Sequence, residues 1–421
     1  MASTERTTRV PDRGTDRRGA IGPDPVVRRA MWAVAGVFTL NGFGFASWVS
    51  RIPSARDELG LQSGPLGLVL LGLSFGAVLS LPLAGVIVTR FGAAATVTVT
   101  SLLMAVGLVT VAVGTSIGVL PVVVGLFAMG LGQGSWDVAM NVEGAAVEQR
   151  LGRAIMPRFH AGFSVGTVVG ALLGAGAAGA GLPVRTHLVI VAVVIAVLAP
   201  LAARAFLPSV AQGSPEAAEP APAGAVGRAW REPRTLLIGL VVLAFAFSEG
   251  TGNDWLALAT VDDYGQSQAV GSLVFAVFVA AMTVGRLVGT PLLDRLGRVV
   301  VLRGTAGIAV LGLLAVVLGS SLPFAVAGAA LWGFGSSLGF PVGMSAAADD
   351  PARSAARVSV VASIGYTAFL AGPPLIGFLG QHVGIQRSLS VAAALLVIGF
   401  LVAASTRMLP GTTLGAGPAA D

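Results

Sequence analysis

Apolar segments of 20 or more residues recur along the whole chain, and short polar connections separate each from the next. At a rise of about 1.5 Å per residue, 20 residues suffice to cross the roughly 30 Å hydrocarbon core of a bilayer. We predict twelve membrane-spanning helices, over residues 30–50, 65–89, 95–115, 119–142, 159–180, 184–205, 235–257, 268–290, 299–319, 322–345, 358–380 and 387–407.

The longest internal polar segment divides these helices into two sets of six. Residues 207–234 are rich in proline, alanine and glutamate, a composition that cannot build a core and is typical of a disordered linker. Polar composition also predicts disordered tails at 1–28 and 408–421. We therefore predict an all-α membrane protein with six-helix bundles at 29–206 and 235–407.

Composition supports this interpretation, because only 11% of the residues are charged and the mean hydropathy is +0.85, whereas a soluble domain carries about 25% charged residues. All 26 basic residues are arginine. With the N-terminus inside, 22 of them fall in tails, inner loops or inner helix ends, and only Arg51, Arg56, Arg185 and Arg387 fall outside. The positive-inside rule then predicts that both termini are cytoplasmic.

Several function classes are excluded by what the sequence lacks. The basic charge is scattered over loops, so no nucleic-acid partner is expected despite an isoelectric point near 11.1. The absence of lysine excludes a P-loop ATPase site, and the absence of cysteine excludes thiolate metal sites. The three histidines are isolated in the sequence. We expect no metal, no cofactor and no enzymatic activity.

The two halves carry matching short motifs. TRFG at 89–92 closes the second predicted helix as DRLGR at 294–298 closes the eighth, and GLG at 130–132 matches GFG at 333–335. Trp48 ends the first helix as Trp255 ends the seventh. Equivalent motifs six helices apart indicate a duplicated six-helix unit, an organisation found in many secondary transporters.

These residues carry a family resemblance that covers residues 29 to 407. The chain resembles the major facilitator superfamily (MFS) of transporters, because GTPLLDRLGR at 289–298 is similar to the loop motif that latches the cytoplasmic side in that family. The resemblance assigns the latch to Asp294, Arg295, Gly297 and Arg298. In the first half, Thr89 and Ala93 replace the aspartate and the final arginine, which leaves a latch there in doubt.

More narrowly, WDVAMNVEGAAVE in the fourth helix and SEGTGNDW in the seventh resemble a bacterial subgroup related to fucose–proton symporters. Gln133, Asp137 and Asn141 are spaced four residues apart and lie on one face of the fourth helix. A charge at the centre of a spanning helix costs about 2.5–3.5 kcal/mol on insertion scales and normally faces a cavity or a partner. Asp137 is therefore either a structural acid held by its neighbours or part of a translocation cavity.

The seventh helix carries a second acid, Glu249, with Asn253 four residues later. No arginine is expected at matching depth on any helix, and a carboxyl group in a low dielectric without a cation favours its protonated form. An acid that binds and releases a proton as a cavity alternates sides is what proton-coupled transport requires. In the resembled sugar–proton symporters an acid at this point couples protons, which assigns that role to Asp137; Glu249 rests on its position alone.

Aromatic, amide and hydroxyl side chains on helices one, four, five, seven and eleven are candidates for binding a solute of mixed polarity. For each of these residues, the alternative to substrate binding is ordinary packing between helices. The candidate substrate-binding residues are Asn41, Trp48, Gln133, Asn141, Ser164, Asn253, Trp255, Tyr366 and Thr367.

The function predicted first is proton-coupled symport of a sugar-like or other polar solute by a monomer in a bacterial cell membrane. A proton-antiporting exporter of drugs or metabolites is the alternative, although Ala171 stands where exporters carry a proline in the fifth helix. A sensor or channel outside this class would need neither the duplication nor the DRLGR motif. The partners expected are a small-molecule substrate, protons and the lipid bilayer.

Overall fold

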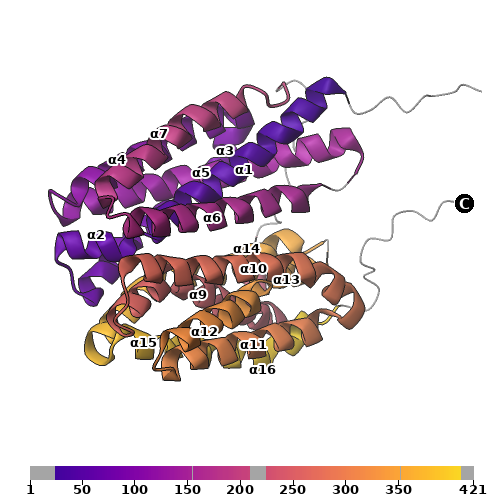
Figure 1. The fold of residues 1–421 in the computed structure, drawn as a ribbon. Coiled ribbons are helices and arrows are strands. Elements are labelled where there is room, and N and C mark those ends of the chain that lie inside the picture. The colour runs from indigo at the N-terminus through magenta and orange to yellow at the C-terminus, as the bar shows by residue number, and fades with distance from the viewer. Residues whose placement is uncertain (1–23, 154, 209–223, 351, 409–421) are drawn as a thin grey trace, which may run out of the picture.

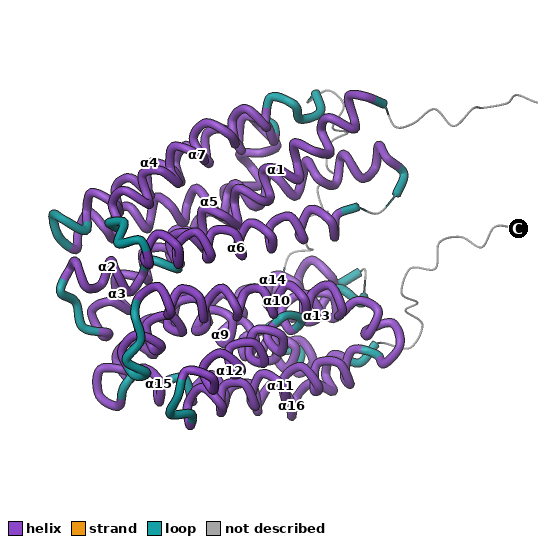
Figure 2. The backbone as a smooth tube through the Cα atoms, in the orientation of Figure 1, coloured by secondary structure: helices purple, strands orange, loops and turns teal. Residues whose placement is uncertain are grey.

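A computed structural model of the chain describes residues 24–153, 155–208, 224–350 and 352–408. The expected tails at 1–28 and 408–421 therefore lie almost entirely outside the described residues, as do residues 209–223 of the expected linker. Every regular element in the described part is helical, and the loops are short (Figure 2). Twelve of the described helical segments are long and apolar enough to span a membrane, which confirms the predicted number of spans.

The N-terminal bundle forms the upper half of Figure 1 and contains six long helices and one short helix. Its elements are α1 (Pro25–Val49), α2 (Ile52–Leu59), α3 (Ser63–Phe91), α4 (Ala93–Gly114), α5 (Val119–Leu151), α6 (Met156–Gly179) and α7 (Val184–Ala203).

The C-terminal bundle forms the lower half of Figure 1 and follows the short helix α8 (Ala225–Ala229). This helix and the start of α9 lie inside the segment expected to be a linker. The elements of the bundle are α9 (Pro233–Asp262), α10 (Gln268–Leu296), α11 (Arg298–Leu318), α12 (Leu322–Ser336), α13 (Gly339–Ala347), α14 (Ser354–Val383), α15 (Ile385–Ser388), α16 (Ser390–Val402) and the 3-10 helix η2 (Ala403–Thr406).

Two helix boundaries differ from the sequence prediction in ways that bear on the site. The helix expected at 268–290 continues to Leu296, so its last residues project beyond the apolar run. The span expected as one helix at 322–345 is divided between α12 and α13. Pro341 explains this division, because its ring would collide with the carbonyl of Ser337 in a continuous helix, and the break falls at that turn.

Glycines let the helices of each bundle approach closely. A β-carbon at Gly130 would collide with the carbonyl of Leu73 in α3, and one at Gly333 would collide with the carbonyl of Phe278 in α10. The matching GLG and GFG motifs therefore pack equivalent helix pairs in the two bundles. On α6, a β-carbon at Gly166 would likewise collide with the carbonyl of Thr39 in α1. Close backbone packing accounts for these glycines.

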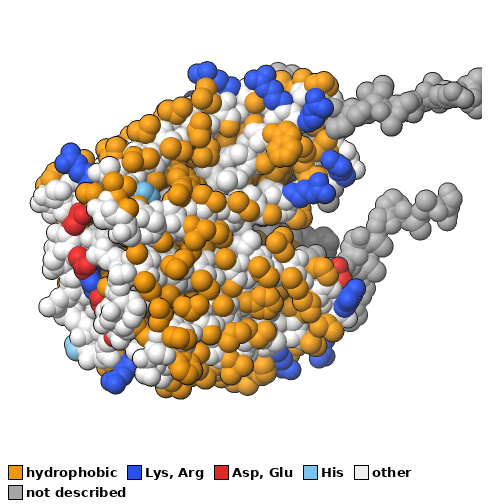
Figure 3. All heavy atoms as spheres, viewed as in Figure 1, with side chains coloured by type: hydrophobic (Ala, Val, Ile, Leu, Met, Phe, Trp, Pro, Cys, Tyr) orange, Lys and Arg blue, Asp and Glu red, His pale blue; other side chains and the backbone are white. Residues whose placement is uncertain are grey.

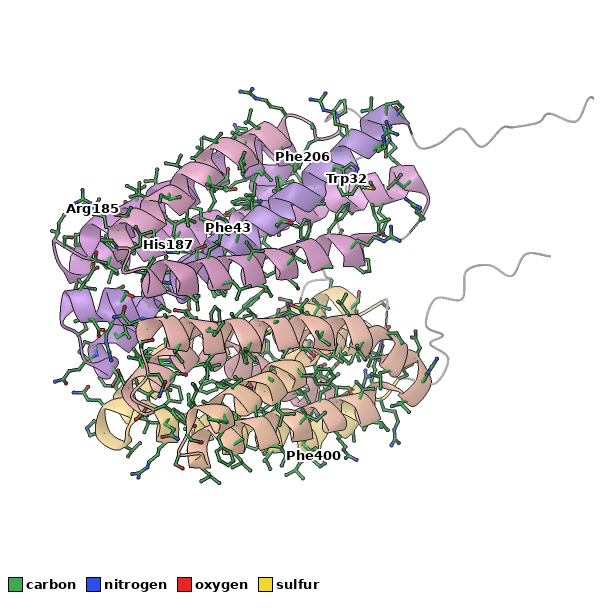
Figure 4. The ribbon with its side chains drawn as sticks, viewed as in Figure 1. Trp32, Phe43, Arg185, His187, Phe206 and Phe400 are labelled. Atoms are coloured by element: carbon green, nitrogen blue, oxygen red, sulfur yellow. The ribbon has the colours of Figure 1, made fainter. Side chains whose placement is uncertain are left out.

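The two ends of the molecule differ in charge and in contact between the bundles. We call the end that carries α2 and α15 the closed end, and the end where α1 begins and η2 terminates the open end (Figure 1). Acidic side chains show at the closed end in Figure 3, whereas arginines gather at the opposite end and apolar side chains cover the surface between them. Figure 4 places Arg185 and His187 of α7 toward the closed end and Phe206 toward the open end.

Candidate functional site

Two connected cavities lie between the bundles. The inner one, which we call the deep chamber, has a volume of about 300 Å³, and the outer one, the vestibule, has a volume of about 800 Å³ and is lined by residues of the open end. Both sizes are in the range of small-molecule sites. The six residues that line both cavities form what we call the neck: Asp137, Phe163, Glu249, Thr283, Arg286 and Phe369.

Asp137 lies at the neck and faces both cavities. It is on α5, where Gln133, one turn closer to the closed end, lines the deep chamber. Asn141, one turn closer to the open end, donates from Nδ2 to the main-chain carbonyl of Asp137 at 2.8 Å and approaches its Oδ1 at 3.4 Å. The carboxyl group of Asp137 makes no ion pair with any residue in the described ranges. Asn141 is uncharged and bonds mainly to the main chain, so it does not neutralise this acid.

Glu249 has a cation partner, contrary to the expectation that no arginine lies at its depth. Arg286 Nη2 lies 3.0 Å from Glu249 Oε1, and the two side chains are 35% and 22% exposed. The expectation was wrong because α10 continues to Leu296, which places Arg286 ten residues, or about 15 Å, from the helix end. The two acids of the neck therefore differ, since one is paired and the other is not.

Five of the predicted substrate-binding residues line the two cavities. Asn41, Gln133, Asn253 and Tyr366 line the deep chamber, and Ser164 lines the vestibule. Asn41 is 1% exposed, and neither atom of its amide has a hydrogen-bond partner in the described part of the chain. A buried amide without partners is costly, and Asn41 carries this free donor and acceptor at the wall of the deep chamber.

Four predicted substrate-binding residues line neither cavity. Trp48 and Trp255 are 1% and 0% exposed and lie near the closed-end termini of α1 and α9, where the bundles meet. Trp48 is seven residues beyond Asn41, about 10 Å further toward that end. Asn141 contacts Asp137 instead, and Thr367 donates to the carbonyl of Ile364 in its own helix.

Aromatic rings connect the vestibule to the deep chamber on the side of the C-terminal bundle. The ring of Tyr366 lies between those of Phe340 and Phe369, with centroid distances of 6.1 Å and 6.5 Å. Phe340 lines the vestibule and Phe369 the neck. Aromatic rings therefore line both cavities and the neck on this side.

Sequence reasoning missed two charged residues of the deep chamber, Arg286 and Asp254. Asp254 directly follows Asn253 on α9. It lies five residues from Glu249, so the four-residue spacing that joins Glu249 to Asn253 does not include it. The general signal was available for both, since any ionisable residue inside a spanning helix is a candidate for function. Among the described residues, no group of three His, Asp or Glu side chains is placed to hold a metal ion.

The DRLGR motif lies at the open end of the C-terminal bundle. Asp294, Gly297 and Arg298 line the vestibule, and Arg295 is exposed beside them. Arg298 Nη1 lies 2.6 Å from Asp349 Oδ1, while Arg234 Nη2 lies 2.9 Å from Asp349 Oδ2. Asp294 makes no ion pair with a described residue. In this conformation Arg298 therefore forms its ion pair within the C-terminal bundle, and Asp294 has no charged partner among the described residues.

At the closed end, five residue pairs join the bundles by hydrogen bonds. Arg56 Nη2 donates to Asp262 Oδ1 at 2.8 Å, and Gln381 Nε2 donates to Gln62 Oε1 at 2.7 Å. The remaining pairs are Ser54–Gln268, Asp57–Gln268 and Ser50–Ser272. These contacts separate the deep chamber from the closed end, so the cavities lead to the open end.

The sequence matches the family described as "Major Facilitator Superfamily" over residues 34–261 and 251–419. The chain is 34% identical to the uncharacterized transporter y4wD of Sinorhizobium fredii, over 83% of this chain and 90% of that protein. Its fold is similar to that of the nucleoside transporter NupG, with a TM-score of 0.72 at 15% identity, covering 91% of this chain and 98% of that one.

The transporter FucP in the outward conformation matches with a TM-score of 0.63 at 16% identity, covering 91% of this chain and 100% of that one. The family and these relatives are transporters, not enzymes. Twelve spans, two cavities between duplicated bundles and these similarities lead to one conclusion. The chain belongs to the Major Facilitator Superfamily of membrane transporters.

Proposed function

We propose that the chain is a proton-coupled symporter that carries a polar, hydroxylated small molecule into the cytoplasm. The observation that carries this proposal is the position of Asp137, which faces both cavities without an ion pair from any described residue. An acid inside the membrane that has no cation partner favours its protonated form until water reaches it. At the neck, opening of the vestibule supplies that water and lets the proton leave.

The orientation in the membrane follows from the distribution of arginine. Under the positive-inside rule the arginine-rich open end faces the cytoplasm, so we propose that both termini are cytoplasmic in a bacterial cell membrane. The vestibule then delivers solute and proton to the cytoplasm. Because a single chain supplies both walls of the deep chamber, we propose that it acts as a monomer.

The class of solute follows from the polar groups of the deep chamber. Asn41, Gln133 and Asn253 offer amide donors and acceptors, and Tyr366 offers a hydroxyl group on an aromatic ring. Such groups match a molecule that carries several hydroxyl groups. Two proteins of similar fold are named for such solutes, a nucleoside in one and fucose with a proton in the other.

The test uses the purified full chain in proteoliposomes. Thermal-shift measurements with a panel of sugars, polyols, nucleosides and amino sugars select a ligand, since a ligand stabilises the folded state by RT ln(1 + [L]/Kd). That ligand is then added outside vesicles that contain a pH-sensitive dye. Inward movement of the solute should acidify the lumen, and an imposed inward proton gradient should drive accumulation.

Asp137→Asn should bind the ligand and exchange it at equal concentrations, but it should neither acidify the lumen nor accumulate solute. Glu58→Gln, which neutralises an exposed acid of α2, is the matched control and should behave as wild type. Accumulation by Asp137→Asn at the wild-type level would show that this acid is structural. Alkalinisation of the lumen during uptake would indicate proton antiport and contradict symport.

A further inference from the structure

Asp254 is an acid of the deep chamber to which the proton-coupling proposal gives no role. We infer that Asp254 binds a protonated amine, so that the solute is a hydroxylated small molecule that also carries an amino group. This inference deepens the proposed function and rests on it. It follows from the balance of charge in the chamber, the depth of each acid and the other polar groups that line the chamber.

The charges that line the deep chamber do not balance. Its carboxylates belong to Asp137, Glu249 and Asp254, and Arg286 is the one cationic side chain among its described lining residues. Arg286 pairs with Glu249 at 3.0 Å. His160 lines only the vestibule and so does not face Asp254. Asp137 and Asp254 therefore have no cation in the described part of the protein to pair with. Inside a membrane such an acid is neutral until water or a bound cation stabilises its charge.

The two unpaired acids lie at different depths. Asp137 belongs to the neck, where the vestibule reaches it. Asp254 lines only the deep chamber and lies five residues beyond Glu249 on α9, about 7.5 Å nearer to the closed end. A proton carrier needs access to water on the releasing side, which Asp137 has in this conformation. Asp254, at the blind end, is instead placed to hold a charged group of the solute.

Other polar groups of the chamber wall, above all the unpaired amide of Asn41, point independently to a ligand. Asn41 is 1% exposed, and both atoms of its amide lack partners in the described structure. Gln133 and Asn253 line the same chamber. These amides can bind hydroxyl groups as donors or as acceptors. The occupant is therefore polar at several positions, and the carboxylate of Asp254 selects for positive charge at one of them.

The remaining lining residues favour an organic cation over a metal ion. Within the described ranges, the chamber acids are not grouped closely enough to hold a metal. Phe45 and Phe275 also line the chamber, and aromatic faces attract organic cations. A chamber of about 300 Å³ is at the small end of ligand pockets and accommodates a molecule of the size of an amino sugar.

The test compares ligands that differ only in the amino group. The probes are glucosamine against glucose, galactosamine against galactose, and ethanolamine against ethylene glycol, each titrated into the purified chain at pH 7. At least one amine should bind about tenfold more tightly than its neutral counterpart, in line with a hydrogen bond between charged groups. Equal binding within every pair, or no binding by any amine, would overturn the inference.

Variants assign the preference to one side chain. Asp254→Asn keeps the shape of the side chain and should lower the affinity for the amine about tenfold, to the level of its neutral counterpart. Asp254→Glu keeps the charge and should retain the preference, which guards against a loss caused by misfolding. Asp137→Asn should keep the preference for the amine, and Glu58→Gln should change nothing. A preference that survives in Asp254→Asn would overturn the assignment.

The outcome for this inference can be separated from that for proton coupling. If an amine binds through Asp254 but a proton gradient does not drive its accumulation, the coupling proposal fails and the amine site stands. If a neutral sugar accumulates with protons while its amine does not bind, the amine site fails and the coupling proposal stands.

Discussion

Gly92 in the N-terminal bundle and Gly297 in the C-terminal bundle end equivalent helices with nearly the same backbone angles, φ 81° and ψ 160° against φ 77° and ψ 161°. Such values suit glycine, because a β-carbon is strained at positive φ. The GLG and GFG motifs likewise pack against equivalent neighbours. Where backbone meets backbone or turns sharply, the two bundles use the same residues.

The same pair of bundles differs in its polar and charged residues. Asp137 lies seven residues after Gly130 on the continuous helix α5, whereas Phe340 lies seven residues after Gly333, past the break between α12 and α13. At the open end, Arg298 pairs with Asp349 in one bundle, and Ala93 takes the place of the arginine in the other. The repeated packing holds two different sets of side chains, so one bundle supplies the unpaired acid of the neck and the other the buried ion pairs.

The largest expected effect is on the ion pairs of the C-terminal bundle. Asp349→Asn leaves Arg298 and Arg234 without their shared carboxylate, whose side chain is 4% exposed. Removal of one partner from a buried pair costs about 3–5 kcal/mol. We expect this variant to lose its monomer peak in size-exclusion chromatography at a temperature several degrees below wild type.

The matched change in the N-terminal bundle is Glu148→Gln. Glu148 Oε2 accepts from the main-chain N–H groups of Ile155 and Met156 at 2.6 Å and 2.7 Å, and an amide oxygen can still accept those hydrogen bonds. We therefore expect Glu148→Gln to lower the free energy of unfolding by less than Asp349→Asn does, by about 1 kcal/mol. Equal losses in the two variants would contradict the contrast between the bundles.

A second effect concerns movement between conformations. Asp294 has no ion pair with described residues while the open end is open, and we propose that it holds this end closed in the alternate conformation. Asp294→Asn should reduce transport several-fold and favour the open vestibule, measured as distances between spin labels at Arg153 and Arg353. Thr89→Ala should have little effect, because Thr89 donates only to carbonyls of its own helix. Similar losses in both variants would argue against a single dominant latch.

A third prediction concerns an ion pair at the closed end, to which each bundle contributes one side chain. Arg56 and Asp262 form a partly exposed pair across the bundles, with side chains 14% and 31% exposed. Such pairs contribute about 0.2–1 kcal/mol. Arg56→Gln and Asp262→Asn should each widen the distances between labels at Glu58 and His382, and the double variant should add little to either single change. Additive effects would show that the pair does not hold this end closed.

The spans were predictable because apolar length is set by the bilayer, and all twelve were found. Helix ends were less predictable, because an apolar run shows where the chain lies in lipid. The helix itself can continue beyond that run into water. The fourth helix was expected to end at 142 and continues to Leu151, and the eighth continues to Leu296. The break at Pro341 was missed because apolar composition continues through it.

The same causes limit what the sequence revealed of the site. Helical spacing placed Gln133, Asp137 and Asn253 among the residues that line the deep chamber. The ion pair between Glu249 and Arg286 was missed because the predicted helix ended at 290, which placed Arg286 too close to the membrane surface. Trp48 was a candidate for binding the solute, but it lies near the closed-end terminus of α1 and lines neither cavity. Which face lines a cavity depends on how the bundles lean together, and no single helix encodes that.

The smallest expected effect is a pH dependence confined to the C-terminal bundle. Arg357 Nε donates to Glu232 Oε2 at 2.6 Å just before α9, and this hydrogen bond lowers the pKa of Glu232 below its ordinary value of 4.5. A carboxyl group with a lowered pKa stabilises the folded state above its ordinary value, and that stabilisation is lost as the pH falls through the lowered pKa. Glu232→Gln should therefore be slightly less heat-stable than wild type at pH 7 and equally stable under acid conditions. Arg357→Gln should reproduce the pattern, and a difference between Glu232→Gln and wild type that persists in acid would show that Glu232 acts through packing instead.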